Sequence, residues 1–159
     1  MLRDLLRFVA TVAVVGIFAH VFGEALPRQR FRWDRFPWRS FSWEQDGRIY
    51  SKLKIERWKD RLPDKSKVVK STVRKAVGAD RSAEHLLQLI AETCVAEFIH
   101  WLLLLVSPVL VLTMKTPLRL WATILYGASN IPFIMIQRYN RPRLARLYEK
   151  TRKREKGTL

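Results

Sequence analysis

Three ionisable residues, Glu92, Glu97 and His100, stand near the start of a stretch that is otherwise apolar enough to cross a bilayer. An ionised side chain costs about 3 kcal/mol or more at the centre of a membrane, so such residues suggest a functional site. Glu97 and His100 are three apart and therefore neighbours on a helix surface, where a carboxylate can orient an imidazole. The spacing predicts His100 as a general base, Glu97 as its orienting partner and Glu92 as a further catalytic residue.

The polar residues of this stretch share one helix face. At 100° per residue, those from Glu92 to Ser107 fall within an arc of roughly 140°. A second polar stripe follows on the next predicted helix, at Thr123, Tyr126, Asn130 and Gln137. Two facing stripes predict a wet, protein-lined groove that opens to the cytoplasm. The alternative is a polar seam that holds helices together without chemistry.

A second cluster of candidate residues combines cations with amide and aromatic side chains at a predicted membrane boundary. Its members are Gln137, Arg138, Tyr139, Asn140, Arg141 and Arg143. Guanidinium groups bind phosphate or carboxylate in a two-pronged geometry, so the cluster predicts recognition of such a group. The alternative is a stop-transfer signal that grips anionic lipid headgroups.

The sequence offers little for a metal or a bound cofactor. Glu97-x-x-His100 resembles half of a di-iron site, but that site needs two such motifs, and the chain has one copy and three His in all. With Cys94 as the single cysteine, neither an intramolecular disulfide nor a Cys-based zinc site is expected. No Gly-rich phosphate loop or nucleophile elbow is found. We expect no metal and no bound cofactor.

The composition indicates a membrane protein. The 159 residues are 48% hydrophobic and carry a net charge of +16. Nucleic-acid binding would also explain that charge, but the apolar windows are about 20 residues long, which is the length that crosses a bilayer. We therefore expect membrane lipids as partners and no nucleic acid.

The elements that must position these residues are predicted to be helices. Crossings are expected at 6–25, within a long helix over 83–114 bent at Pro108, and at 118–136, the last two forming an antiparallel hairpin across a short turn. The first is interpreted as a retained helix because its apolar run exceeds that of a secretory signal. The fold class is an all-α, small polytopic membrane protein in one domain.

The remaining segments are basic. Residues 27–80 form an aromatic and basic segment at the membrane surface or in the cytoplasm, in which Tyr50 to Pro63 could be an amphipathic helix or a short strand and turn. Asp80 or Ser82 would cap the long helix. Residues 137–159 form a basic tail, helical beyond Pro142.

The distribution of Lys and Arg predicts the topology. Residues 27–92 hold 17 of them and residues from 138 onward hold 9, against 2 in the head and 2 at the hairpin turn. Because positively charged connections stay in the cytoplasm, we expect a protein of the cell membrane with its N-terminus outside the cell and its C-terminus in the cytoplasm.

An ordered set of short motifs resembles a known family. The motifs are Trp58-Lys59-Asp60 with Leu62-Pro63, then Glu92-Thr93, Ala96-Glu97, Ile99-His100-Trp101, Asn130-Ile131-Pro132, and Gln137 to Leu144. Over roughly residues 40 to 148 the chain resembles the glycosyl-4,4'-diaponeurosporenoate acyltransferase family of the staphyloxanthin pathway. The first 40 residues match only in character.

The resemblance implies transfer of a fatty acyl group to a hydroxyl of a glycosylated isoprenoid, carotenoid or related glycolipid. Acyl-CoA or another acyl thioester is the expected co-substrate. Its phosphates would meet Arg138, Arg141 and Arg143, with Lys59 beside Trp58 and Asp60 as a further contact, while Glu92 and Asn130 place the acceptor or polarise the thioester carbonyl. The alternative function is a non-catalytic membrane adaptor that binds partner helices. The acceptor, the acyl length and the oligomeric state stay open.

Overall fold

A computed structural model describes residues 2–62 and 82–157, and every regular element within those ranges is a helix. The all-α prediction is confirmed for this part of the chain. Residues 63–81, which include the alternative cap Asp80, lie outside the described residues. The chain divides into two compact units, one of residues 1–27 and 95–134 and the other of residues 28–94 and 135–159.

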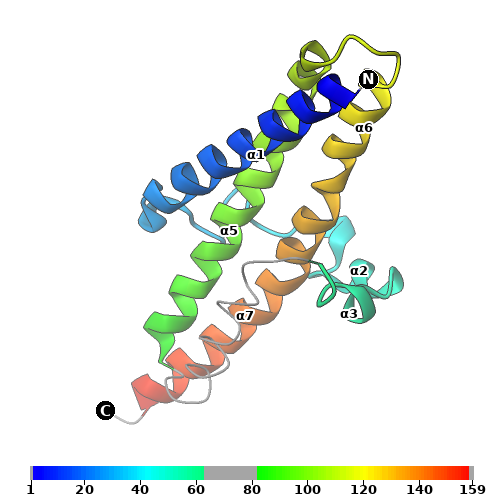
Figure 1. The fold of residues 1–159 in the computed structure, drawn as a ribbon. Coiled ribbons are helices and arrows are strands. Elements are labelled where there is room, and N and C mark those ends of the chain that lie inside the picture. Colours follow the sequence, from blue (N-terminus) through cyan, green and yellow to red (C-terminus); the bar gives the residue numbers. More distant parts are fainter. Residues whose placement is uncertain (1, 63–81, 158–159) are drawn as a thin grey trace. The chain divides into compact units, whose positions relative to one another are not determined.

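The first unit is built on α1 (Leu2–Ala25), the later part of α5 (Ala83–Val106), the 3-10 helix η3 (Ser107–Thr113) and α6 (Arg119–Ser129) (Figure 1). α1 runs antiparallel to α5 and η3. A Cβ on Gly23 would lie 3.2 Å from the Ile99 side chain, while at the other end Asp4 accepts a hydrogen bond from the Lys115 N–H at 3.2 Å. The glycine allows close approach of the two helices at that point.

Pro108 changes the course of the long helix more than the sequence suggested. Instead of one bent helix over 83–114, α5 ends at Val106 and the tighter η3 begins at Ser107. Pro108 has no N–H for the Leu104 carbonyl, four residues earlier. The Ser107 hydroxyl donates to that carbonyl at 2.8 Å and satisfies it.

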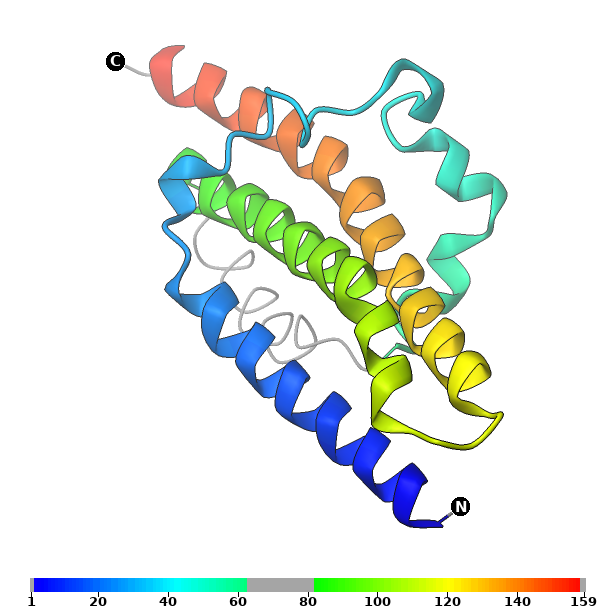
Figure 2. The ribbon, with the colours of Figure 1, turned by 90° about the horizontal axis from the view of Figure 1, so that it is seen from above.

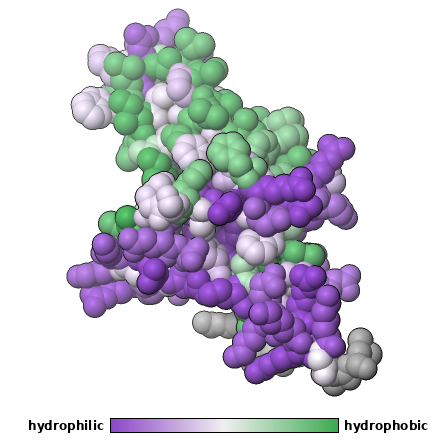
Figure 3. All heavy atoms as spheres, turned by 180° about the vertical axis from the view of Figure 1, so that it is seen from behind, coloured by the Kyte–Doolittle hydropathy of each residue, from purple (hydrophilic) through white to green (hydrophobic). Residues whose placement is uncertain are grey.

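Two described helical segments, Leu2–Ala25 and Ala83–Thr113, are long and apolar enough to cross a membrane. α1 buries only Ala19 and Gly23 and exposes side chains such as Leu6 and Phe18. Figure 3 shows apolar side chains gathered over the end of the first unit that carries η3 and α6. Exposed apolar surface of this kind is typical of a face that meets lipid or a partner.

The predicted third crossing at 118–136 is interrupted at Asn130. α6 ends at Ser129 and α7 (Ile131–Gly157) begins two residues later, because Pro132 cannot donate to the Ala128 carbonyl. With 11 residues, α6 alone is too short to span a bilayer. Three complete crossings and a transmembrane hairpin therefore stay predictions.

The second unit places the segment 28–62 and the first part of α5 along α7 (Figure 2). The segment contains η1 (Arg28–Arg30), η2 (Ser42–Glu44), α2 (Arg48–Lys52) and α3 (Ile55–Trp58), so the choice left open for residues 50–62 is settled as short helices. Their apolar side chains enclose a small core with α7, made of Tyr50, Ile55, Ile136 and Tyr139. Ser82 accepts a hydrogen bond from the His85 N–H at 3.3 Å, as predicted for the N-cap.

α7 is continuous through Pro142, whereas the sequence suggested a tail that becomes helical only beyond it. The proline frees the Arg138 carbonyl inside the helix. Gly47 packs against this opened turn with φ +82°, and a Cβ on it would lie 3.3 Å from the carbonyl oxygens of Arg138 and Tyr139. Position 47 therefore needs glycine for two reasons: its backbone is left-handed, and it lies very close to α7.

Substituting Gly47→Ala is expected to destabilise the protein by more than about 1 kcal/mol, because alanine is strained at positive φ and its methyl group would press on α7. Thermal unfolding in detergent measures the effect. Gly16→Ala is the matched control, since a Cβ there meets nothing within 4 Å, and it should be neutral or slightly stabilising. Equal melting temperatures for both variants would contradict this reading of Gly47.

Candidate functional site

The polar centre of the first unit is a contact between His100 on α5 and Asn130 at the α6–α7 junction. His100 Nδ1 lies 3.0 Å from Asn130 Oδ1, and the imidazole ring stacks on Phe133 with centroids 4.6 Å apart and planes 7° apart. Asn130 is 4% exposed. The imidazole is therefore held by a hydrogen bond at one nitrogen and by a ring face.

The backbone around Asn130 determines which way its amide points. The Asn130 Nδ2 group donates to the carbonyls of Tyr126 at 3.0 Å and Gly127 at 3.5 Å. Carbonyl oxygens only accept, so Nδ2 must face them and Oδ1 must face His100. Oδ1 is also only an acceptor, and His100 Nδ1 must therefore carry the hydrogen. In the neutral imidazole the lone pair is then on Nε2, the atom that could take a proton from a substrate.

Glu97 lies on the same helix and is 1% exposed. Its Oε1 accepts a hydrogen bond from Trp101 Nε1 at 3.3 Å. The sequence assigned the orientation of His100 to Glu97, whereas the structure brings Asn130 to the imidazole Nδ1. Orientation of His100 by Glu97 stays a prediction.

In the second unit, Arg138 on α7 meets a buried carboxylate that the sequence analysis did not single out. Arg138 Nε and Nη2 donate to the two oxygens of Glu44 at 2.5 and 2.8 Å, and Glu44 is 1% exposed. The Tyr50 hydroxyl and the Phe41 N–H also donate to Glu44. The signal for this pair is present in the sequence, because Glu44 is one of few acids in a strongly basic segment.

Burial raises the pKa of the Glu44 carboxyl, but hydrogen bonds from Arg138, Tyr50 and Phe41 outweigh it, and the net pKa lies below the ordinary value. Burial and the same carboxylate raise the pKa of the Tyr50 phenol. Glu44 is therefore ionised and Tyr50 neutral at physiological pH. A carboxylate in this state satisfies the buried guanidinium of Arg138.

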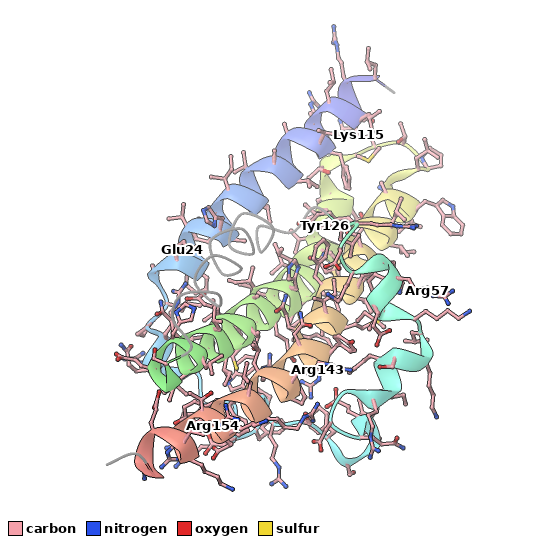
Figure 4. The ribbon with its side chains drawn as sticks, turned by 90° about the horizontal axis from the view of Figure 1, so that it is seen from below. Glu24, Arg57, Lys115, Tyr126, Arg143 and Arg154 are labelled. Atoms are coloured by element: carbon pink, nitrogen blue, oxygen red, sulfur yellow. The ribbon has the colours of Figure 1, made fainter. Side chains whose placement is uncertain are left out.

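The other two arginines of the cluster also bond to protein groups. Arg141 donates to Thr93 Oγ1 and to the carbonyls of Thr93 and Trp38, at 2.9, 2.9 and 2.8 Å. Arg143, labelled in Figure 4, reaches from α7 to Ser51 at 3.5 Å and lies over the Tyr139 ring at 3.4 Å. These contacts join α7 to the 28–62 segment and to the start of α5. They favour a structural role for residues that were predicted to contact phosphate.

Tyr139 is anchored in the same network through its hydroxyl, which donates to Glu56 at 2.8 Å. Burial, together with this hydrogen bond to a carboxylate, raises the pKa of Tyr139. Gln137, two residues earlier on α7, is also buried, and Asn140 is half-buried. This part of α7 therefore packs into the unit.

The remaining predicted site residues lie at the edges of the second unit. Arg28 donates two hydrogen bonds to Glu92, at 2.7 and 3.1 Å, so Glu92 is ion-paired. The Trp58 indole donates to the Leu53 carbonyl at 3.0 Å, and Lys59 pairs with Asp60 at 3.1 Å. Within residues 2–62 and 82–157, no group of three or more His, Cys, Asp or Glu could hold a metal ion.

Comparison with known proteins supplies the family. Residues 27–150 match the model of a family described as glycosyl-4,4'-diaponeurosporenoate acyltransferase. Curated proteins of that name from Staphylococcus aureus strains bovine RF122 / ET3-1 and MRSA252 are each 30% identical to the chain over 127 residues, 79% of this chain and 76% of the relative. No solved structure matches significantly. The matched range contains all the candidate residues described above.

The Glu44–Arg138 pair predicts a pH-dependent stability. The pKa of Glu44 is lower in the folded than in the unfolded protein. Its contribution to folding stability is therefore present above the unfolded pKa near 4.5 and is lost as the pH falls through the folded pKa. Glu44→Gln should cost about 3–5 kcal/mol at pH 7, since it leaves Arg138 buried without a counter-charge. Melting temperatures between pH 3 and pH 7 measure both effects.

The matched control is Asp34→Asn, which removes an exposed ion pair with Arg32. Exposed pairs contribute little, so this variant should melt like the wild type at pH 7. A Glu44→Gln protein that is as stable as the Asp34→Asn protein would show that the buried pair does not hold the unit together.

Proposed function

The chain belongs to the glycosyl-4,4'-diaponeurosporenoate acyltransferase family, and from this membership we propose that it transfers a fatty acyl group to a sugar hydroxyl of a glycosylated isoprenoid lipid. The chain is an acyltransferase, as its family is. The printed names of its relatives specify a glycosylated diaponeurosporenoate, and a glycosylated carotenoid or a related glycolipid is the acceptor proposed here. The observation that carries the chemistry is the His100–Asn130 pair, because a hydroxyl nucleophile needs a base.

The proposed donor is an acyl thioester, with acyl-CoA as the first candidate. His100 Nε2 takes the proton of the sugar hydroxyl as its oxygen attacks the thioester carbonyl carbon. The C–O bond forms, the C–S bond breaks, and the departing thiolate takes the proton from the imidazolium. The products are a glycolipid ester and a free thiol, and the base returns to its neutral form.

Asn130 is proposed as the residue that positions His100. Its Oδ1 accepts the Nδ1–H of both the neutral and the protonated imidazole, so it keeps one tautomer and one ring orientation throughout the reaction. Glu97 is a buried carboxylate three residues from His100, and we propose that it stabilises the imidazolium that forms. Glu92 is proposed to position the segment at Arg28, because its carboxylate already receives two hydrogen bonds from that residue.

The arginine cluster is proposed to support the site. Arg138 and Arg141 donate to carboxylate, hydroxyl and carbonyl acceptors on neighbouring segments, which suits residues that hold the second unit in shape. Their loss would then lower stability first and activity as a consequence.

The proposed location is the cell membrane, with three crossings, the N-terminus outside and the C-terminus in the cytoplasm. Support comes from the two apolar segments of spanning length and from the asymmetry of Lys and Arg. The third crossing would consist of α6 and the first turns of α7. Its interruption at Asn130 is tolerated in a membrane when side chains satisfy the freed backbone groups, as the Asn130 amide does for Tyr126.

A reporter that is active only in the cytoplasm tests this topology. Fused after Leu159 it should be active, and inserted at the Lys115 turn it should be silent. If the two fusion proteins are equally abundant and the reporter is instead silent after Leu159 and active at Lys115, the topology is the inverse of the one proposed.

His100→Ala is expected to lower the rate of ester formation about 10²- to 10⁴-fold, the usual contribution of a general base. The loss should fall on kcat, with little change in the KM for either substrate. Product formation by purified protein, measured by mass, checks it. A variant that inserts normally and acts within tenfold of the wild type would exclude His100 as the base.

The role of Asn130 is tested by comparing Asn130→Asp with Asn130→Ala. Asp keeps an oxygen that accepts from His100 Nδ1–H but loses the amide donor to the Tyr126 carbonyl, whereas Ala loses both. If Asn130 orients the base, Asn130→Asp should keep a higher kcat than Asn130→Ala. Adding Asn130→Ala to His100→Ala should then lower kcat little further than His100→Ala alone. Equal kcat values for the two Asn130 variants would assign it to the helix junction alone.

A further inference from the structure

The second unit contains a cavity of about 870 Å³ that the catalytic proposal does not use. It lies between the segment 33–46 and one face of α7. The lining residues on that helix recur at intervals of three and four and so form one stripe: Arg141, Pro142, Ala145, Arg146, Glu149, Lys150 and Lys153. Its volume is within the range of ligand sites, about 300–1,000 Å³.

The floor of the cavity is buried and hydrogen-bonded, and its rim is charged. Arg141, Pro142 and Ala145 are buried, and Arg141 is held by Thr93 and by the Trp38 carbonyl. Arg39, Arg146, Lys150 and Lys153 are exposed at the rim. Five cationic side chains line the cavity against two carboxylates, Asp46 and Glu149, so the cavity attracts anions.

The spacing of the cations is unfavourable for the helix alone. Arg146 and Lys150 are four residues apart, and like charges at that spacing destabilise a helix. A bound anion would remove this repulsion. Guanidinium and ammonium groups that converge from one helix face are typical of phosphate recognition.

The opposite wall offers aromatic rings. Trp33, Trp38 and Phe41 line the cavity. The Trp38 ring is positioned by Phe31, with centroids 5.4 Å apart, and the Phe41 ring lies under the Arg138 guanidinium at 4.6 Å. Indole and phenyl rings beside cations bind ligands that combine a flat base with phosphates.

We propose that this cavity binds the nucleotide part of the acyl donor, a base and phosphates of the kind found in CoA. The inference deepens the proposed function and rests on it. A lipid headgroup shares the phosphate chemistry but has no flat ring for the aromatic wall. The donor's phosphates therefore meet Arg39, Arg146, Lys150 and Lys153, and Arg138 and Arg143 serve the structure.

Direct binding to the purified full-length protein in detergent tests this assignment. CoA and adenosine 3',5'-bisphosphate, titrated by calorimetry, should both bind, and pantetheine without phosphates should not. The double variant Arg146→Gln/Lys150→Gln should raise the Kd for CoA about 100-fold or more, since it removes two charge-assisted hydrogen bonds, each worth a factor of ten or more. Arg152→Gln/Lys156→Gln removes the same charge from exposed positions of α7 outside the cavity and should change the Kd less than about twofold.

A labelling experiment on the wild-type chain covers the case in which the double variant does not fold. CoA should protect Lys150 and Lys153 from an amine-reactive reagent, with Lys156 as the unprotected control. If CoA leaves Lys150 and Lys153 reactive, the cavity does not bind it. If anionic-lipid vesicles protect these lysines and the bisphosphate does not, the site binds headgroups and the nucleotide assignment is overturned.

The two proposals fail in different ways. His100→Ala should bind CoA with an unchanged Kd while forming ester about 10²- to 10⁴-fold more slowly. CoA binding at the cavity without acyl transfer to any glycolipid would overturn the proposed function and leave the cavity assignment standing. Acyl transfer from acyl-CoA, together with an unchanged Kd for CoA in Arg146→Gln/Lys150→Gln, would overturn the cavity assignment and leave the function standing.

Discussion

The buried ion pair between Glu44 and Arg138 is the interaction on which the second unit depends. Moving two charges out of water costs several kcal/mol per ion, and the pair is stable only if its remaining hydrogen-bonding groups are satisfied. The Tyr50 hydroxyl and the Phe41 N–H donate hydrogen bonds to the Glu44 carboxylate, and the Phe41 ring covers the Arg138 guanidinium. The pair joins residues 94 apart in sequence and so holds the basic aromatic segment against α7. The cavity described above lies between residues 33–46 of this segment and α7.

Three prolines interrupt the regular hydrogen bonding of the helices, and a polar side chain or a glycine lies close to each of them. Pro108 frees the Leu104 carbonyl, which accepts a hydrogen bond from the Ser107 hydroxyl. Pro132 lies at the α6–α7 junction. There the Asn130 side-chain NH2 donates to the Tyr126 carbonyl, so the Asn130 Oδ1 faces His100. Pro142 opens α7 where Gly47 packs, and Arg143 donates to the Tyr139 carbonyl at 2.7 Å. The breaks in helix geometry thus position the side chains proposed for catalysis and support.

The sequence predicted features that depend on local periodicity. Local periodicity predicted the helical structure, the apolar helix over 6–25 and the polar face from Glu92 to Ser107. The cap was predicted as Asp80 or Ser82 in the same way, from side chains within a few residues of one another. The partners of His100 and Arg138 could not be predicted this way. Glu97 was chosen for His100 because it is one turn away, whereas the structure brings in Asn130, 30 residues later. Such long-range contacts depend on how helices pack, and periodicity alone does not determine packing.

The central claim is that this chain, by itself, esterifies a glycolipid hydroxyl. Purified protein in liposomes, supplied with acyl-CoA and a glycosylated isoprenoid, tests it most directly by mass spectrometry of the extracted lipids. The account predicts a new lipid heavier than the acceptor by one acyl group less one hydrogen, formed without any other protein. Liposomes that yield no such product until a second protein is added would show that the chain is an adaptor and contradict the account.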